Sequence, residues 1–134
     1  MADAMTLEII TPERVVLKEE VASVVVPGTD GYLGILPHHA AMIASLRIGV
    51  VKYRQGDRFY PLAIGGGFFE VVDNRAVILA NTAERPEEID IGRAQAAAER
   101  ARRRLQESSD ETDVQRAEAA LKRALNRLRV AKGE

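Results

Sequence analysis

The sequence predicts an α+β protein in which an antiparallel β-sandwich is followed by a two-helix hairpin. Short β-branched and aliphatic runs, separated by turn residues, continue as far as Asn81, and after Glu84 the apolar period becomes helical. The charge also changes sign: residues 1–89 hold 8 Lys+Arg and 12 Asp+Glu, net −4, whereas residues 90–134 hold 11 and 8, net +3. We therefore place the sandwich in residues 1–84 and the hairpin in residues 85–134.

The strands are predicted from runs of four to seven residues bounded by Pro, Gly, Asn or Asp. The expected strands are Leu7 to Ile10, Arg14 to Leu17, Ala22 to Val26, Tyr32 to Leu36, Ile48 to Arg54, Phe59 to Ile64, Phe68 to Val72 and Arg75 to Ala80. Two runs, Val24 to Val26 and Ala76 to Leu79, are apolar at every position. Such strands are covered on both faces, by a second sheet or by a neighbouring subunit.

Three consecutive glycines, Gly65 to Gly67, precede the strand that begins at Phe68. A phosphate-binding loop would continue with Lys and Ser or Thr and open a helix, and neither follows here. A β-bulge or a close approach of two backbones is the favoured interpretation.

The first helix is expected to begin at Asp90, whose carboxylate can cap it, and the second after a polar break at residues 107–111. Ser108 and Glu111 have the spacing of a capping box for the second helix. A loop of about five residues makes the helices neighbours, and Gly133 lies past the end. The apolar stripes are Ala94, Ala97, Ala98, Ala101 and Leu105 on the first helix and Val114, Ala117, Leu121, Leu125 and Leu128 on the second. Alanine methyl groups bury little area, so we expect a weakly held pair of helices that a ligand can switch.

The composition argues against catalysis in this chain. There is no cysteine and there are only two histidines, so no thiolate metal site and no nucleophile–histidine constellation can be built. No carboxylate cluster suggests a magnesium site, and no metal site is expected. The first residues have neither the basic nor the apolar region of a secretory signal, and no apolar run approaches the ~20 residues that cross a bilayer.

Four arginines of the helical region are paired on helix faces, Arg93 with Arg100 and Arg123 with Arg127. Two unit charges at ~6 Å repel by about 0.7 kcal/mol in water and about 3 kcal/mol at an effective dielectric constant near 20. A polyphosphate between the helices would relieve that repulsion, although an ordinary solvated face remains the alternative. Asp90 is either simply a cap or also an acceptor for a ribose hydroxyl or an adenine amino group.

The segment Gly31-Tyr32-Leu33-Gly34-Ile35-Leu36-Pro37-His38-His39 resembles the Gly-x-Leu-Gly-Ile-Leu-Pro-x-His signature of the epsilon subunit of bacterial F-type ATP synthases. Gly66-Gly67-Phe68-Phe69-Glu70-Val71 is similar to the second signature of that family. Order and spacing also match through residues 83–85, 89–94 and 121–128, so the resemblance covers nearly the whole chain.

The resemblance implies a ten-stranded sandwich and a two-helix domain on the central rotor stalk, where the subunit joins the gamma subunit to the ring of c subunits. Such a subunit is noncatalytic and peripheral at the cytoplasmic face of the bacterial plasma membrane. The folded hairpin would bind ATP as a regulatory ligand, and the extended hairpin would inhibit ATP hydrolysis by meeting the beta subunit, with the alpha subunit as a further candidate partner.

The same resemblance assigns the site residues. The ATP-binding set is Glu84, Ile89, Asp90, Arg93, Ala94, Arg100, Arg123 and Arg127; the beta-subunit contacts are Arg103, Arg116, Lys122 and Arg123; and the c-ring contacts are Tyr32 and His39. Tyr32 stands where many relatives have an acidic residue. Gly92, in the first turn of the helix, favours fraying of the unliganded hairpin.

Two other functions remain as alternatives. A nucleic-acid-binding module would use the basic hairpin, but the sandwich is acidic and aromatic residues make up only 4% of the chain. A nucleotide hydrolase would need the phosphate loop and metal ligands that the sequence lacks.

Overall fold

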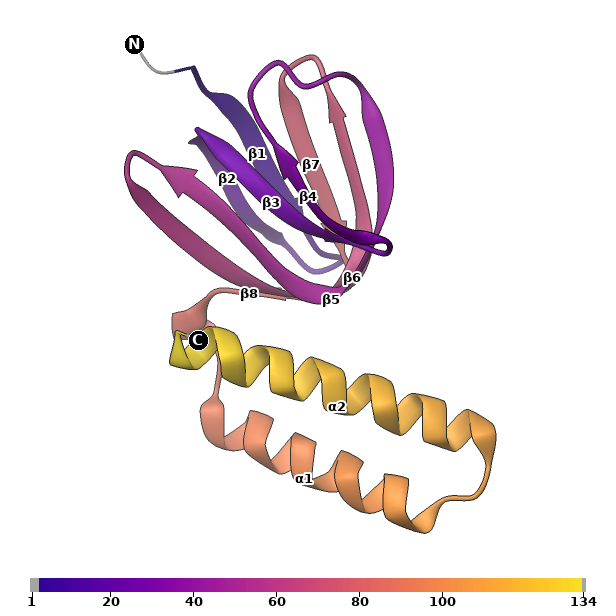
Figure 1. Cartoon of the computed structure of the whole chain (residues 1–134). Coiled ribbons are helices and arrows are strands. Elements are labelled where there is room, and N and C mark those ends of the chain that lie inside the picture. The colour runs from indigo at the N-terminus through magenta and orange to yellow at the C-terminus, as the bar shows by residue number, and fades with distance from the viewer. Residues whose placement is uncertain (1–2, 134) are drawn as a thin grey trace. The chain divides into compact units, whose positions relative to one another are not determined.

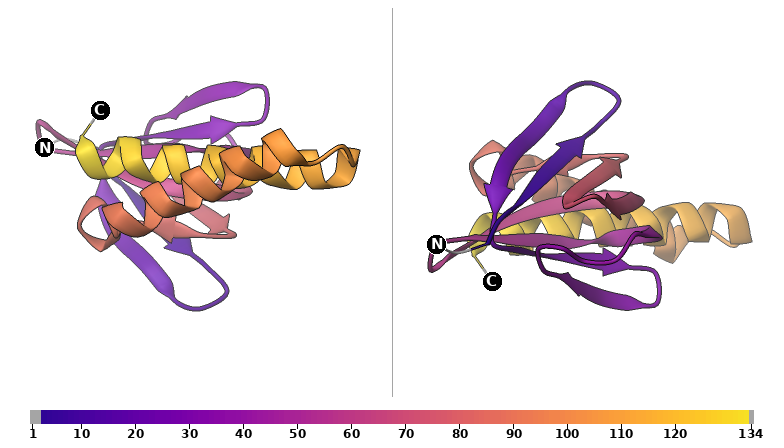
Figure 2. Two further views of the ribbon diagram at one scale, coloured as in Figure 1. Left: turned by 90° about the horizontal axis from the view of Figure 1, so that it is seen from below. Right: turned by 90° about the horizontal axis from the view of Figure 1, so that it is seen from above.

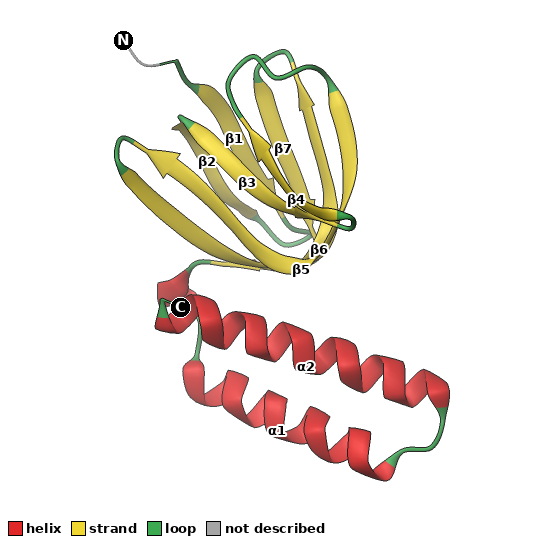
Figure 3. Cartoon of the chain, viewed as in Figure 1, coloured by secondary structure: helices red, strands yellow, loops and turns green. Residues whose placement is uncertain are grey.

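The computed structural model describes residues 3–133 and contains two compact units, divided between Glu84 and Arg85. Strands make up the first unit, and two α-helices with one short 3₁₀ turn make up the second (Figure 3). The α+β fold class, with a β-sandwich before a helical hairpin, is confirmed. Within residues 3–133, no helix is both long enough and apolar enough to cross a membrane.

The sheet of the first unit has the strand order β2-β1-β7-β6-β5-β3-β4, and β8 pairs with β6. All pairs are antiparallel except β1 with β7. The strands are β1 (Met5–Ile10), β2 (Val15–Val21), β3 (Ser23–Gly28), β4 (Gly31–Ile35), β5 (Met42–Gln55), β6 (Arg58–Val72), β7 (Arg75–Ala80) and β8 (Ala83–Glu84).

Strands β5 and β6 hold the two layers of the sandwich together, because each is long enough to belong to both (Figure 1). They pair with each other from Met42↔Val71 to Gln55↔Arg58. Residues 67–72 of β6 also pair with β7, whereas residues 63–64 pair with β8. Counting each half of these two strands separately gives the ten strands that the resemblance implied.

The predicted start of β5 at Ile48 was wrong, since the strand begins at Met42. Ile43 is 73% exposed, so an apolar side chain occupies an outward position and obscures the alternation that marks a strand. The turn predicted at Asp73 and Asn74 joins β6 to β7, and both residues have positive φ angles, 50° and 62°. Two such residues suit a two-residue hairpin connection.

The core lies between the two layers and consists of aliphatic side chains with Phe69 among the largest of them. The close backbone approach expected at the glycines is present at Gly67, where φ is 146° and a Cβ would collide with the Leu79 carbonyl oxygen. The register between β5 and β6 is the same on both sides of these glycines, so no extra residue is inserted. Close approach, rather than a bulge, explains the glycine run.

The second unit contains a 3₁₀ turn, η1 (Pro86–Glu88), and the helices α1 (Ile91–Glu107) and α2 (Glu111–Lys132). Asp90 caps α1 as predicted, because its Oδ1 accepts a hydrogen bond from the Arg93 N–H at 3.0 Å. Gly133 ends α2 with a left-handed φ of 73°, and its N–H donates to carbonyl oxygens of the last turn.

The predicted capping box of Ser108 with Glu111 was wrong. Asp110 caps α2, and its Oδ1 accepts the N–H of Thr112 at 2.8 Å and of Asp113 at 3.3 Å. Ser108 instead ends α1, where its N–H donates to the Arg104 carbonyl oxygen. Ser108 and Asp110 are both strong N-cap types. The loop consists only of residues 108–110, so the cap lies at Asp110, two positions later than predicted.

The two helices lie side by side and antiparallel (Figure 1), and α1 crosses over α2 when the hairpin is seen from below (Figure 2, left). Alanines form most of the buried surface: Ala94, Ala98 and Ala101 on α1 and Ala117 and Ala124 on α2. The predicted stripe on α2 was wrong at Leu125, which is 37% exposed. It follows Ala124 and therefore lies about 100° around the helix from it.

Candidate functional site

The start of α1 combines a carboxylate, an apolar side chain and an arginine. Asp90 is exposed and uses one oxygen as the helix cap, Ile89 is buried, and Arg93 is exposed. Ala94 is buried in the helix contact, so the backbone can approach closely there. A ligand at this end of the hairpin would meet polar atoms from Asp90 and Arg93 beside an apolar surface.

The four arginines predicted to hold phosphate lie on one side of the hairpin. With 3.6 residues per turn, Arg93 and Arg100 lie about 110–130° from the centre of the buried alanine face of α1, and Arg123 and Arg127 lie about 70–110° from that of α2. Both rotations have the same sense along the chain. Because the two helices run in opposite directions, the two pairs of arginines therefore face the same side of the hairpin. Arg93 and Arg100 are exposed, and Arg123 and Arg127 are half-buried.

Most of these arginines have no acidic partner in the folded hairpin. Among residues 3–133, the side chains of Arg93, Arg100 and Arg123 make no hydrogen bond or ion pair, whereas Arg127 does interact with a neighbour. Glu84, the other predicted ligand, is a half-buried residue of β8 and belongs to the first unit. The positive charge on this side of the helices is therefore largely uncompensated.

The predicted beta-subunit contacts do not share one surface of the folded hairpin. Arg103 is directed away from α2, and Arg116 and Arg123 lie on the arginine side. Lys122 lies about 150° from the buried alanine face of α2, in the opposite direction. Arg103, Arg116 and Lys122 are exposed. A single partner surface could meet all four only after the helices rearrange.

The predicted c-ring contacts lie in β4 and in the loop that follows it. Tyr32 is 49% exposed, and the Arg47 guanidinium lies 4.8 Å from the centre of its ring. The Tyr32 hydroxyl accepts a hydrogen bond from the Val50 N–H at 3.4 Å. The His39 Nδ1 lies 2.7 Å from the Ala40 carbonyl oxygen, an arrangement that suits donation by the ring. Tyr32 therefore presents an aromatic surface that the Arg47 guanidinium partly covers.

An apolar patch on the outer face of the sandwich was not identified from the sequence. Ile43, Phe68 and Leu79 are 73%, 59% and 54% exposed, and they come from the neighbouring strands β5, β6 and β7. Phe68 is the direct cross-strand partner of Leu79. The fully apolar run from Ala76 to Leu79 was the available sequence signal, and within residues 3–84 the outward side chain of Leu79 stays exposed.

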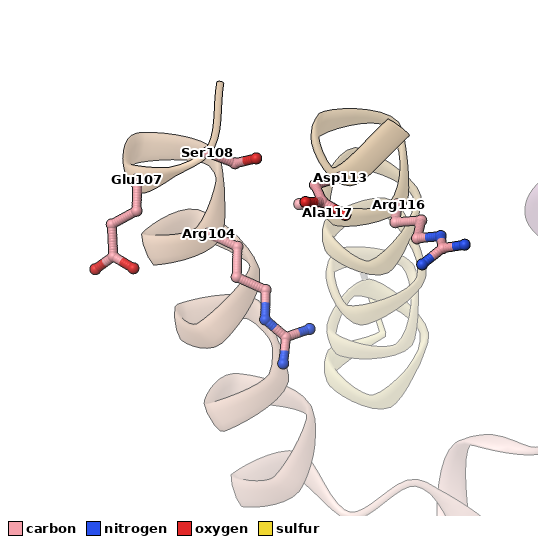
Figure 4. A pocket seen from close by; sticks show the side chains of 6 residues that line it. All are labelled: Arg104, Glu107, Ser108, Asp113, Arg116 and Ala117. Atoms are coloured by element: carbon pink, nitrogen blue, oxygen red, sulfur yellow. The ribbon is translucent and has the colours of Figure 1, made fainter. Parts of the chain in front are cut away.

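A pocket of about 490 Å³ lies at the loop end of the hairpin and was also not identified from the sequence. Arg104 extends from α1 toward α2 and Asp113 points from α2 toward α1, whereas Glu107 and Arg116 point outward (Figure 4). Ser108 and Ala117 complete the lining. Among residues 3–133, no group of three or more His, Cys, Asp or Glu side chains could hold a metal ion.

The chain therefore combines a β-sandwich that exposes an apolar patch with a helical hairpin rich in arginine. Residues 4–86 match the family described as ATP synthase, Delta/Epsilon chain, beta-sandwich domain, and residues 87–132 match the family's long alpha-helix domain. The chain belongs to this family as an epsilon subunit of the bacterial F-type ATP synthase, a component of the central stalk.

Individual relatives agree. The chain is 50% identical to the ATP synthase epsilon chain of Desulforamulus reducens over 105 residues, which are 78% of this chain and 80% of that protein. It is 55% identical to that of Carboxydothermus hydrogenoformans over 105 residues, 78% of each chain. A chain in the Euglena gracilis mitochondrial ATP synthase structure, which contains OSCP, F1 and the c-ring, has a TM-score of 0.77 and 28% identity, covering 89% of this chain and 76% of that chain.

Proposed function

We propose that this epsilon subunit is a noncatalytic regulator whose folded hairpin binds ATP and whose extended hairpin inhibits ATP hydrolysis. One observation carries the proposal: Arg93, Arg100, Arg123 and Arg127 lie on one side of the hairpin, and among residues 3–133 the first three make no side-chain hydrogen bond or ion pair. A triphosphate provides the missing negative charge, and guanidinium groups bind phosphate oxygens through paired, charge-assisted hydrogen bonds.

The remaining predicted residues would bind the nucleoside. Asp90 has a second carboxylate oxygen beside the one that caps α1, and it can accept a ribose hydroxyl or an adenine amino group. Ile89 and Ala94 would provide apolar contact and close approach. Glu84, which the resemblance adds to this set, belongs to the first unit and stays a prediction.

The alanine-rich contact explains how ATP can control the hairpin. Burying a methyl group stabilises less than burying a leucine side chain, at about 25 cal/mol per Å² of apolar area. Binding to the folded state alone adds about 2.7 kcal/mol at a hundredfold excess of ligand over Kd. That increment is large for a pair of helices with so little apolar side-chain area between them.

The first unit would attach the subunit to the rotor. The patch of Ile43, Phe68 and Leu79 is suited to an apolar partner surface, for which we propose the gamma subunit. Tyr32 and His39 would meet the c-ring. The extended hairpin would bring Arg103, Arg116, Lys122 and Arg123 to acidic residues of the beta subunit or its alpha neighbour, with the complex at the cytoplasmic face of the membrane.

Calorimetric titration of ATP into the full chain tests the sensing role. We expect saturable binding and a higher melting temperature, both strongly weakened in Arg93→Gln and Arg123→Gln. Arg102→Gln is the matched control, because Arg102 lies on the opposite side of α1 and its ion pair with Glu99, at 3.8 Å, is exposed. The absence of heat and of thermal stabilisation at millimolar ATP would remove the sensing role.

The inhibitory role needs the assembled enzyme. ATP hydrolysis by the complex should rise when α2 is deleted from the epsilon subunit, and it should also rise when a designed disulfide keeps α1 and α2 together. If hydrolysis is the same with the hairpin deleted, locked or free, the hairpin does not inhibit.

A further inference from the structure

The arginine side of the hairpin extends beyond the four residues assigned to ATP. By the same helical geometry, Arg104 and Arg116 each lie about 90° from the buried alanine face of their helix, in the direction shared by the other four. Six of the nine arginines in α1 and α2 therefore lie on one side: Arg93, Arg100 and Arg104 on α1 and Arg116, Arg123 and Arg127 on α2. Arg102, Arg103 and Arg129 do not.

The two rows of arginines have the same length. The first and last arginines of each row are eleven positions apart, Arg93 and Arg104 on α1 and Arg116 and Arg127 on α2. At 1.5 Å per residue this separation is about 16 Å along the helix. Because the helices are antiparallel, the rows run beside each other with Arg104 and Arg116 at the loop end. The three phosphates of one nucleotide cannot reach both ends of these rows.

Within residues 3–133, the acidic side chains on this side lie only at the ends of the rows. Asp90 is at the start of α1, and Glu107 and Asp113 line the loop-end pocket with Arg104 and Arg116. Glu99, Glu111 and Glu118 lie on other faces of the helices. Within residues 3–133, neither Arg104 nor Arg116 makes a side-chain hydrogen bond or ion pair.

We propose that this side of the folded hairpin binds linear inorganic polyphosphate, with the loop-end pocket holding the part of the chain that extends past the ATP residues. The proposal rests on the ATP site, since it uses the same four arginines and adds Arg104 and Arg116. A narrow, unbranched anion suits two parallel rows of guanidinium groups, each able to bind phosphate oxygens in pairs.

A nucleic acid fits these rows less well. Residues 85–134 contain no Phe, Tyr or Trp, so the hairpin offers no aromatic surface on which bases can stack. Polyphosphate carries a negative charge on each phosphate, with neither sugars nor bases between them. It would also compete with ATP and hold the hairpin folded, so that stored phosphate would act on the same switch.

The test compares ligands of different length on the full chain. Affinities of ATP, inorganic tripolyphosphate and long-chain polyphosphate are measured by calorimetry at fixed ionic strength, because polyanion binding depends steeply on salt. Long-chain polyphosphate should bind about tenfold or more tightly than tripolyphosphate, as expected from at least one additional charged hydrogen-bonded contact. In the double variant Arg104→Gln/Arg116→Gln that advantage should disappear.

Matched variants separate this site from general charge. Arg102→Gln/Arg129→Gln removes the same charge from the same two helices on other faces and should keep the length dependence. Asp113→Asn should strengthen polyphosphate binding, whereas Arg104→Gln should leave ATP affinity unchanged. Circular dichroism checks that each variant keeps its helices.

Three results would overturn the proposal: equal affinity for short and long polyphosphate, equal losses in the two double variants, or equally tight binding of single-stranded DNA of the same charge. The last result would indicate a general polyanion surface. The measured ATP affinity tests the nucleotide site separately. If ATP binds and no length dependence is seen, only the polyphosphate site fails; if ATP does not bind, the proposed nucleotide site fails as well.

Discussion

Replacing Gly92 by alanine should stabilise the folded hairpin. Gly92 is the second residue of α1, is exposed and does not have a positive φ angle. A Cβ built there lies 3.6 Å from the Asp90 Oδ1, which is an ordinary van der Waals contact, so the methyl group fits without strain. Because glycine loses more backbone entropy on folding, Gly92→Ala should gain about 0.5–1 kcal/mol.

That gain would change the folded-to-unfolded ratio of the hairpin about twofold to fivefold, since RT is about 0.6 kcal/mol. Amide hydrogen exchange of α1 measures it directly: the amides of residues 94–101 should exchange more slowly by that factor if the hairpin opens as a unit. Gly34→Ala is a suitable control, because a Cβ at Gly34 meets nothing within 4 Å and the residue lies in β4.

Faster exchange in Gly92→Ala, or the same change in Gly34→Ala, would refute the reasoning. In the first case the glycine would be needed for its conformation, and in the second the effect would not belong to the hairpin. If the free hairpin is only partly folded, ATP affinity should rise with the folded fraction, so calorimetry on Gly92→Ala gives an independent reading.

Three further predictions concern the cap, the glycine run and the apolar patch. Asp90→Ala should destabilise the hairpin by about 0.5–2 kcal/mol in chemical denaturation, whereas Asp90→Asn should keep most of the cap and report separately on nucleoside binding by calorimetry. Gly67→Ala should destabilise the sandwich by about 1–3 kcal/mol, since its φ is 146° and the new Cβ meets the Leu79 carbonyl oxygen; a stability within 0.5 kcal/mol of the parent would contradict the close approach. Phe68→Ser should leave the unfolding free energy within about 1 kcal/mol of that of the parent, because the side chain is 59% exposed. The same substitution should weaken gamma-subunit binding in a pull-down or titration. Unchanged binding would show that Phe68 is not part of the interface.

Local chemistry explains why much of the fold could be predicted. The turn at Asp73 and Asn74, the cap at Asp90 and the helix end at Gly133 each depend on the conformational preferences of one or two residues. The errors came where several residues could play the same part. Ser108 and Asp110 are both good caps, and the choice between them follows from a loop of three residues. Ile43 looks like a core residue but faces outward on β5.

Part of the candidate site could likewise be predicted from local pattern, and part could not. Helical periodicity was enough to pair Arg93 with Arg100 and Arg123 with Arg127 on helix faces. It could not say which side of one helix adjoins which side of the other, because that depends on the alanines that become buried when the two helices pack. The loop-end pocket, which both Arg104 and Arg116 line, follows from the same packing and had no sequence signal of its own.

The sequence by itself determined the two-part α+β architecture, the boundaries set by turns and caps, and the family, because these depend on local preferences and motifs that are contiguous in the chain. Only the tertiary structure decided that β5 and β6 run through both layers, that an apolar patch faces outward, and that six arginines share one side of the hairpin. The physical reason is that strand register and helix rotation are fixed by contacts between distant segments, where burial of the best-fitting apolar faces selects one arrangement among several that the local pattern allows.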